Sequence, residues 1–98
     1  SGGLNIYPKE IEMVIDEIDG VVESAVVGKP DQDFGEAVIA YLVLEPGISL
    51  DVLDLDTALS SLARFKHPKS LHTIDALPRN AMGKVQKNLL RTNQANPQ

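Results

Sequence analysis

The sequence contains no cysteine, and this excludes a whole class of chemistry. None of its 98 residues can form a disulfide, act as a thiolate nucleophile or bind a metal ion through a thiolate. The two histidines, His67 and His72, lie five residues apart without the further ligands that a zinc site needs. We therefore predict that this chain holds no metal ion, and the lack of cysteine is compatible with a reducing compartment.

Long apolar runs and targeting segments are also missing. The longest apolar stretch, residues 37–44, is far shorter than the roughly 20 residues of a membrane-spanning helix. Residues 1–8 have neither the basic start nor the apolar block of a secretory signal peptide, and no N-x-S/T acceptor occurs. We predict a cytoplasmic protein without a membrane span, or an organellar one if a targeting segment precedes residue 1.

Two common phosphate-binding motifs are absent as well. Gly83 and Lys84 do not end a P-loop, because Pro78 stands where the first glycine is required. Val85 also follows the lysine in place of serine or threonine, and no G-x-G-x-x-G pattern occurs. The chain therefore has neither of these two means of holding a nucleotide.

What the sequence does have is an unequal distribution of charge. Residues 1–60 hold 13 acidic and 2 basic side chains, whereas residues 61–98 hold 7 basic side chains and 1 acidic one. The net charges of −11 and +6 indicate either an anionic ligand at the basic end or two solvated faces of opposite sign. Nucleic acid is not the predicted ligand, because the basic segment has one aromatic residue, Phe65, and no known binding motif.

The first 47 residues predict one helix followed by two strands. A helix is expected over residues 5–20, with Pro8 in its first turn and a single apolar stripe. That stripe consists of Ile11, Val14, Ile15 and Ile18. Residues 21–31 and 36–47 read as strands, and the polar loop between them favours an antiparallel pair. Because the second strand is apolar on both faces, we expect it at the centre of the sheet.

The second half predicts a further helix, a short strand and a final helix. An amphipathic helix is expected within residues 48–66, with Asp54 or Asp56 as its cap. Its apolar stripe consists of Leu55, Ala58, Leu59 and Leu62. Residues 69–77 read as a strand, 78–84 as a loop and 85–94 as a short helix. The whole is one α+β domain with a small mixed or antiparallel sheet flanked by helices.

The two ends of the chain resemble signature motifs of the adenylate-forming superfamily. These motifs are SGGLNIYPKEIE at the start and LPRNAMGKVQKNLLR near the end, and the likeness extends over residues 1–92. The superfamily includes acyl-CoA synthetases, peptide-synthetase adenylation domains and luciferases. The chain is most similar to the malonyl-CoA synthetase branch, notably in NIYPKEIE, DFGEA and NAMGKVQKNLLR.

The resemblance implies that residues 1–98 form the C-terminal cap domain of such an enzyme. In the family, a carboxylic acid attacks ATP to give an acyl-adenylate, the cap domain rotates, and a thiol such as that of CoA displaces AMP. Mg²⁺, the acyl pocket and most of the nucleotide site belong to a large N-terminal adenylating domain that lies outside this chain. The cap domain alone is therefore expected to be inactive.

Lys84 matches the lysine that the family uses to form the adenylate. It follows a run of turn-forming and small residues, which predicts an exposed loop of the kind that often carries binding groups. Gly83 would let the backbone approach a ligand closely. The alternative for Lys84, from composition alone, is an ordinary solvated lysine on a turn.

Two further segments match the parts of the family that contact CoA. Gly2 and Gly3 would line the tunnel for its pantetheine arm, where bare backbone suits a passing ligand. The residues expected at its nucleotide end are Phe65, Lys66, His67 and Lys69. Phe65 could stack on adenine while the others face phosphates, or it could end the apolar stripe of the second helix and belong to the core.

Two other functions stay open on the sequence. A peptide-synthetase adenylation domain would share the fold but deliver its acyl group to a carrier-protein thiol, without a site for the CoA nucleotide. A non-catalytic interaction module would use the basic tail to bind an acidic partner.

Overall fold

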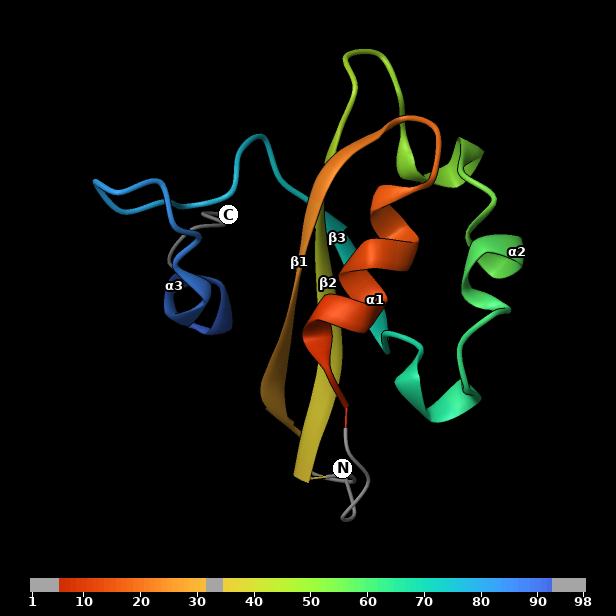
Figure 1. Cartoon of the computed structure of the whole chain (residues 1–98), viewed down its shortest axis with the longest axis horizontal. Helices are drawn as coiled ribbons and strands as arrows, with labels where there is room; N and C mark the ends of the chain where they lie inside the picture. Colours follow the sequence, from red (N-terminus) through yellow and green to blue (C-terminus); the bar gives the residue numbers. More distant parts are fainter. Residues whose placement is uncertain (1–5, 32–34, 93–98) are drawn as a thin grey trace.

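The computed structural model describes residues 6–31 and 35–92, which form a three-stranded sheet with helices on both faces (Figure 1). Its elements are α1 (Pro8–Asp16), β1 (Val21–Asp31), β2 (Gly35–Leu44), α2 (Leu55–Leu59), β3 (Ser70–Thr73) and α3 (Lys87–Arg91), with 3-10 turns at Leu50–Val52 and Arg64–Lys66. Strand β2 is central, antiparallel to β1 and parallel to β3. The predicted α+β class is confirmed, and the sheet is mixed.

Strand β2 separates two apolar cores, because successive side chains of a strand point to opposite faces. Ala40 and Leu42 join the core under α1 and α2, while Ile39 and Tyr41 join the core on the α3 side. All four side chains are buried. The prediction of a central strand that is apolar on both faces is therefore confirmed.

Helix α1 is shorter than predicted but uses the predicted stripe. Pro8 occupies the first turn, and Ile11 and Ile15 are fully buried against the sheet. The helix ends at Asp16, where the backbone tightens into a turn. Gly20, which was expected to end the helix, instead adopts a φ of +100° in the turn that leads into β1.

Helix α2 also stops earlier than the apolar stripe predicts. Asp54 caps it by accepting the N–H of Thr57 at 3.4 Å, as one of the two expected caps. The hydroxyls of Ser60 and Ser61 then donate to carbonyl groups of α2, at 2.6 and 3.4 Å, and the helix ends there. Leu62 is buried nonetheless, from an irregular segment.

The last two elements are shorter than their predicted ranges as well. Strand β3 covers four residues of the expected 69–77, and α3 covers five of the expected 85–94. None of the helices in the described ranges is long and apolar enough to cross a membrane. The long segment between β3 and α3 is left to form the candidate site.

Candidate functional site

Lys84 lies in a tight hairpin that projects from the sheet between β3 and α3 (Figure 1). Arg79 and Val85 pair as an antiparallel bridge at its base. At its tip, the N–H of Gly83 donates to the carbonyl of Asn80 at 3.0 Å, and the N–H of Asn80 donates to the carbonyl of Lys84 at 2.9 Å. Gly83 has a φ of +85°, as a three-residue hairpin loop with a glycine bulge requires.

Side chains within the hairpin hold its backbone further. The amide oxygen of Asn80 accepts the N–H groups of Met82 and Lys84, at 2.9 and 3.0 Å. One guanidinium nitrogen of Arg79 donates to the carbonyl of Gly83 at 2.7 Å, and another pairs with Glu23 of β1. The peptide group that precedes Lys84 is therefore held at both its C=O and its N–H.

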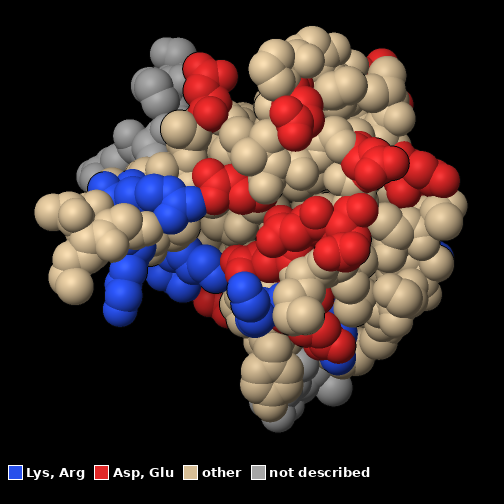
Figure 2. Space-filling view, turned by 45° about the horizontal axis from the view of Figure 1, so that its top comes forward, with Lys and Arg blue, Asp and Glu red and all other residues tan. Residues whose placement is uncertain are grey.

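The side chain of Lys84, in contrast, is exposed and extends from this fixed backbone. No side chain in the described part of the chain pairs with its ammonium group. Figure 2 shows Lys and Arg side chains gathered on the side of the hairpin and α3, next to a surface crowded with Asp and Glu. Lys84 thus carries a positive charge with no counter-ion among residues 6–31 and 35–92, on a backbone that hydrogen bonds hold in place.

Buried residues anchor the hairpin on the α3 side of the sheet. Leu77 precedes it and Leu90 follows it, and both are buried in the same core. The buried hydroxyl of Tyr41 donates to the carbonyl of Leu90 at 3.2 Å, which ties α3 to the central strand. The hairpin is therefore an exposed tip on a well-packed base.

The predicted CoA-contacting residues lie elsewhere, in the turn that follows α2. Phe65 is 43% exposed and belongs to neither core, so the alternative that it ends the apolar stripe of α2 is wrong. The ammonium of Lys66 lies 2.8 Å from a carboxylate oxygen of Glu10. The Nε2 atom of His67 is 3.1 Å from a backbone carbonyl oxygen, and Lys69 is exposed.

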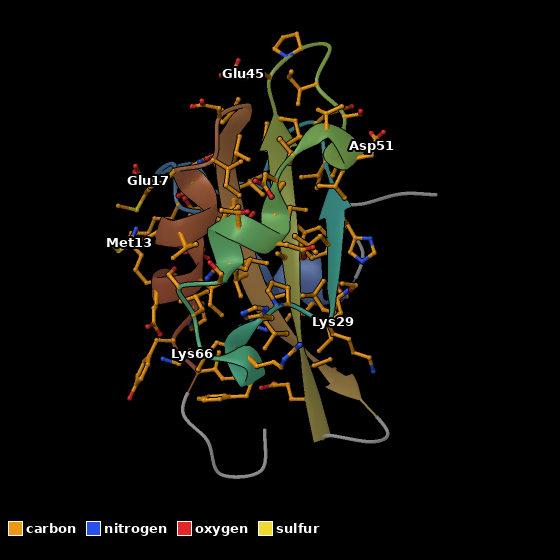
Figure 3. All side chains as sticks on the ribbon, turned by 90° about the vertical axis from the view of Figure 1, so that its right-hand side faces the viewer. Met13, Glu17, Lys29, Glu45, Asp51 and Lys66 are labelled. Atoms are coloured by element: carbon orange, nitrogen blue, oxygen red, sulfur yellow. The ribbon has the colours of Figure 1, made fainter. Side chains whose placement is uncertain are left out.

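The structure does not bring these residues and Lys84 together. Lys66 contacts α1, on the face of the sheet that α1 and α2 cover, whereas the hairpin is anchored in the core on the opposite face. Figure 3 shows Lys66 at the end of the domain away from Glu45 and Asp51. Gly2 and Gly3 lie outside the described residues.

Three ion pairs relate the charge asymmetry of the sequence to the fold. They are Lys66–Glu10, Arg79–Glu23 and Lys87–Glu12. Each joins a base of the second, basic part of the chain to an acid of the first, acidic part. Some of the opposite charges of the two halves therefore neutralise each other within the domain. Neither an anionic ligand nor two solvated faces, the two interpretations of the sequence, includes these internal pairs.

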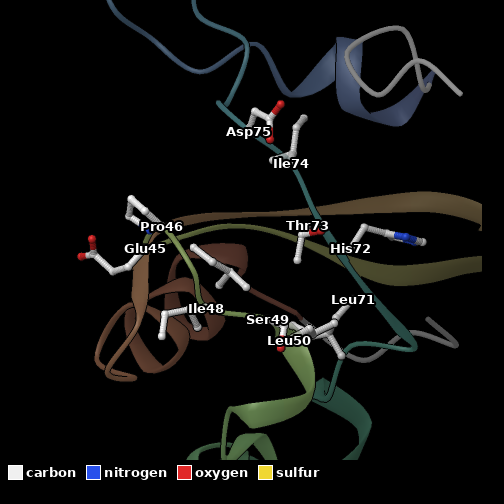
Figure 4. Close-up of a pocket in the computed structure, with 11 residues that line it drawn as sticks. Glu45, Pro46, Ile48, Ser49, Leu50, Leu71, His72, Thr73, Ile74 and Asp75 are labelled. Carbon is white, nitrogen blue, oxygen red and sulfur yellow. The ribbon is translucent and has the colours of Figure 1, made fainter.

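A separate groove of about 750 Å³ opens between the loop after β2 and strand β3 (Figure 4). Its walls include Glu45, Ile48, His72 and Asp75. None of the predicted site residues lines it, and no motif in the sequence pointed to it, since its two walls come from separate segments. The described residues also contain no group of three or more His, Cys, Asp or Glu side chains that could hold a metal ion.

Residues 10–84 match the family described as the AMP-binding enzyme C-terminal domain, and the chain belongs to this family. The match ends at Lys84 itself. The resemblance inferred from the sequence motifs is thereby confirmed.

Similar proteins are acyl ligases of several kinds. The chain is 49% identical over 92 residues to a 3-[(3aS,4S,7aS)-7a-methyl-1,5-dioxo-octahydro-1H-inden-4-yl]propanoyl:CoA ligase of Rhodococcus jostii, covering 93% of this chain and 18% of that protein. It is 46% identical over 90 residues to the fatty acid–[acyl-carrier-protein] ligase ScoC of Streptomyces coeruleorubidus, covering 91% of this chain and 17% of ScoC.

Among solved structures, apo MatB from Rhodopseudomonas palustris superimposes with a TM-score of 0.88 at 52% identity, over 97% of this chain and 19% of MatB. MatB is a malonyl-CoA synthetase, the branch that the sequence motifs indicated. The chain spans about a fifth of the length of each of these relatives.

Proposed function

We propose that this domain is the cap domain of an ATP-dependent acyl-CoA ligase and that Lys84 acts in the first of its two half-reactions. In that step a carboxylate oxygen bonds to the α-phosphorus of ATP, the bond to pyrophosphate breaks, and an acyl-adenylate forms. The observation that carries this proposal is the exposed side chain of Lys84, which extends from a hydrogen-bonded hairpin within the segment that matches the family.

The physical reason is that two anions must approach each other in this step. Negative charge accumulates on the oxygens between the carboxylate and the triphosphate, and a preorganised cation there stabilises the transition state most where water is excluded. A single well-placed donor of this kind contributes about 10²–10³ in rate. Mg²⁺ would be held by ATP and by the large N-terminal domain.

The second half-reaction would use the opposite face of the domain. Phe65, His67 and Lys69 belong to the segment after α2, where Lys66 contacts α1 on the face of the sheet opposite the hairpin. Two separate surfaces suit a domain that rotates between two half-reactions, because each can face the large domain in turn. The ammonium of Lys66 would have to contact a CoA phosphate while it is paired with Glu10, or leave Glu10 to do so.

The test is the substitution Lys84→Ala in the full-length protein that carries this domain. We expect adenylate formation, followed by pyrophosphate release, to fall by about 10²–10³. The thioester step, started from a pre-made acyl-adenylate, should stay within about threefold of the wild type, because that step does not use this cation. The likeness to MatB makes malonate the first acid to assay.

The matched control for this test is Arg91→Gln. Arg91 is an exposed base of α3 outside the hairpin, so its loss removes the same charge without touching Lys84. Equal losses in both half-reactions of Lys84→Ala would contradict the assignment of this lysine to adenylation. The 98-residue chain alone is expected to form no acyl-adenylate.

A second candidate differs in the acyl acceptor. The likeness to ScoC, which is named for an acyl-carrier-protein substrate, favours a protein-bound thiol as a specific alternative to CoA. The two acceptors differ at the end of the pantetheine arm that is remote from the thiol, because CoA carries a nucleotide with phosphates there and a carrier protein does not.

The double substitution Lys66→Gln with Lys69→Gln in the full-length protein separates these candidates. If CoA is the acceptor, its KM should rise about tenfold, since two charge-assisted phosphate contacts are lost. An unchanged KM for CoA, together with acylation of a carrier protein, would favour the alternative. Adenylate formation serves as the internal control and should be unaffected.

A further inference from the structure

One arginine side chain ties the lysine-bearing hairpin to the sheet. Two nitrogen atoms of Arg79 are engaged at once, one with the carbonyl of Gly83 at 2.7 Å and the other with the carboxylate of Glu23. Glu23 belongs to β1 and lies 56 residues earlier in the chain. The planar, forked guanidinium can serve two acceptors in fixed directions, which the single ammonium of a lysine cannot reproduce.

The carbonyl that Arg79 binds belongs to the peptide group directly before Lys84. The N–H of the same peptide group donates to the amide oxygen of Asn80 at 3.0 Å. This group therefore has one restraint from inside the hairpin and one from the sheet. Its orientation sets the direction in which the Lys84 side chain leaves the backbone.

This restraint acts at the glycine of the hairpin, the residue type with the widest choice of backbone conformations. Gly83 has no side chain and adopts a φ of +85°, and no atom beyond Gly83 and its two chain neighbours lies within 4 Å of the place where a Cβ would lie. A glycine in such open space can rotate through many backbone conformations. Without the Arg79 side chain, this peptide group would keep its hydrogen bond to Asn80 but would lose its connection to the sheet.

We propose that Arg79 is a positioning residue for Lys84, which it aligns by joining the Gly83 carbonyl to Glu23 of the sheet. This inference rests on the proposed role of Lys84 in adenylate formation. Glu23 of β1, which has no expected part in the reaction, holds the other side of the Arg79 guanidinium and so fixes it to the sheet. A direct contact of Arg79 with a substrate phosphate is the competing role, because its side chain is 44% exposed.

The full-length protein with Arg79→Gln, with Glu23→Gln, and with both substitutions tests the proposal. Each single variant should lower the kcat of adenylate formation about tenfold, within the roughly 10²-fold loss that a misplacement of about 1 Å can cause. The double variant should be no slower than the slower single variant, because both changes break one connection. The KM for ATP should stay within about twofold.

Two more variants separate geometry from charge. Arg79→Lys keeps the charge but carries its donors on one nitrogen of a flexible chain, without the rigid fork that holds the two acceptors apart, so it should remain several-fold slower than the wild type. Arg91→Gln removes a comparable exposed charge outside the hairpin and should keep the wild-type rate. Hydrogen exchange at the Lys84 amide in the native protein should speed up in Arg79→Gln and Glu23→Gln, as a readout that is independent of activity.

Several results would overturn the proposal. A slow Arg79→Gln beside a wild-type Glu23→Gln, or a large rise in the KM for ATP, would mean that Arg79 contacts the substrate itself. A wild-type rate for Arg79→Gln in an enzyme that Lys84→Ala cripples would also reject it, while leaving the proposed function intact. A wild-type rate for Lys84→Ala would instead reject the proposed function, and the positioning role with it.

Discussion

Two basic segments of this domain use the same type of side chain in opposite ways. In the hairpin, hydrogen bonds hold the backbone around Lys84 and leave its ammonium without a partner among the described residues. In the turn after α2, the side chains themselves are held. Lys66 pairs with Glu10 at 2.8 Å, and the ring of His67 lies 3.1 Å from a backbone carbonyl oxygen.

This difference shows that the availability of a charge decides what it can do. A lysine next to a carboxylate has much of its field cancelled, and an exposed pair of this kind stabilises a protein by only about 0–1 kcal/mol. A lysine on a fixed backbone without a counter-ion keeps its full field for an incoming anion. A count of basic residues in the sequence treats the two as equal.

The comparison predicts that a change in the hairpin backbone will slow adenylate formation more than the same change in another turn. Gly83 and Gly47 have nearly the same φ, +85° and +82°, and both have open space where a Cβ would lie. Substitution by alanine should cost each site about 1 kcal/mol of unfolding free energy, because L-residues disfavour this conformation. Urea denaturation of the 98-residue chain measures that cost.

The two substitutions should differ in activity. In the full-length protein, Gly83→Ala should slow adenylate formation about tenfold, since relief of the strain turns the peptide group before Lys84. Gly47→Ala, in the turn after β2, should leave the rate unchanged and is the matched control. If both variants slow the step equally, the hairpin has no special part in it.

Much of the fold could be predicted because it depends on local patterns. The helical spacing of Ile11 and Ile15 indicates the buried face of α1, and both side chains are fully buried. The apolar character of residues 37–44 on both faces requires cover on both sides, which is the environment of a central strand. Such local patterns predict the buried faces whichever distant segments of the chain pack against them.

The features that the sequence did not predict depend on distant or competing contacts. The stripe that continues to Leu62 predicts a longer α2, but the hydroxyls of Ser60 and Ser61 bind the last carbonyl groups of the helix. No local pattern in the sequence predicts the parallel pairing of β2 and β3, because the segment between them is long enough for β3 to run in either direction beside β2. Lengths and pairings were therefore less predictable than the order of elements.

The candidate site divides in the same way. The exposed loop around Lys84 could be predicted from its turn-forming residues, and the family resemblance indicated its role. The partner of Arg79 could not, since Glu23 lies 56 residues away and many acids of the first half could have taken its place. The exposure of Phe65 was also open, because its position continues the apolar stripe but falls beyond the end of α2.

The smallest effect that tests the comparison concerns the pair Lys66–Glu10. The two side chains are 21% and 43% exposed, so a double-mutant cycle with Lys66→Gln and Glu10→Gln should give a coupling of about 0.2–1 kcal/mol in urea denaturation of the 98-residue chain. Adenylate formation by the full-length protein should stay within about twofold of the wild type. A coupling well above this range would make the turn after α2 a structural connection, and its lysine would then be a poor candidate for binding a CoA phosphate.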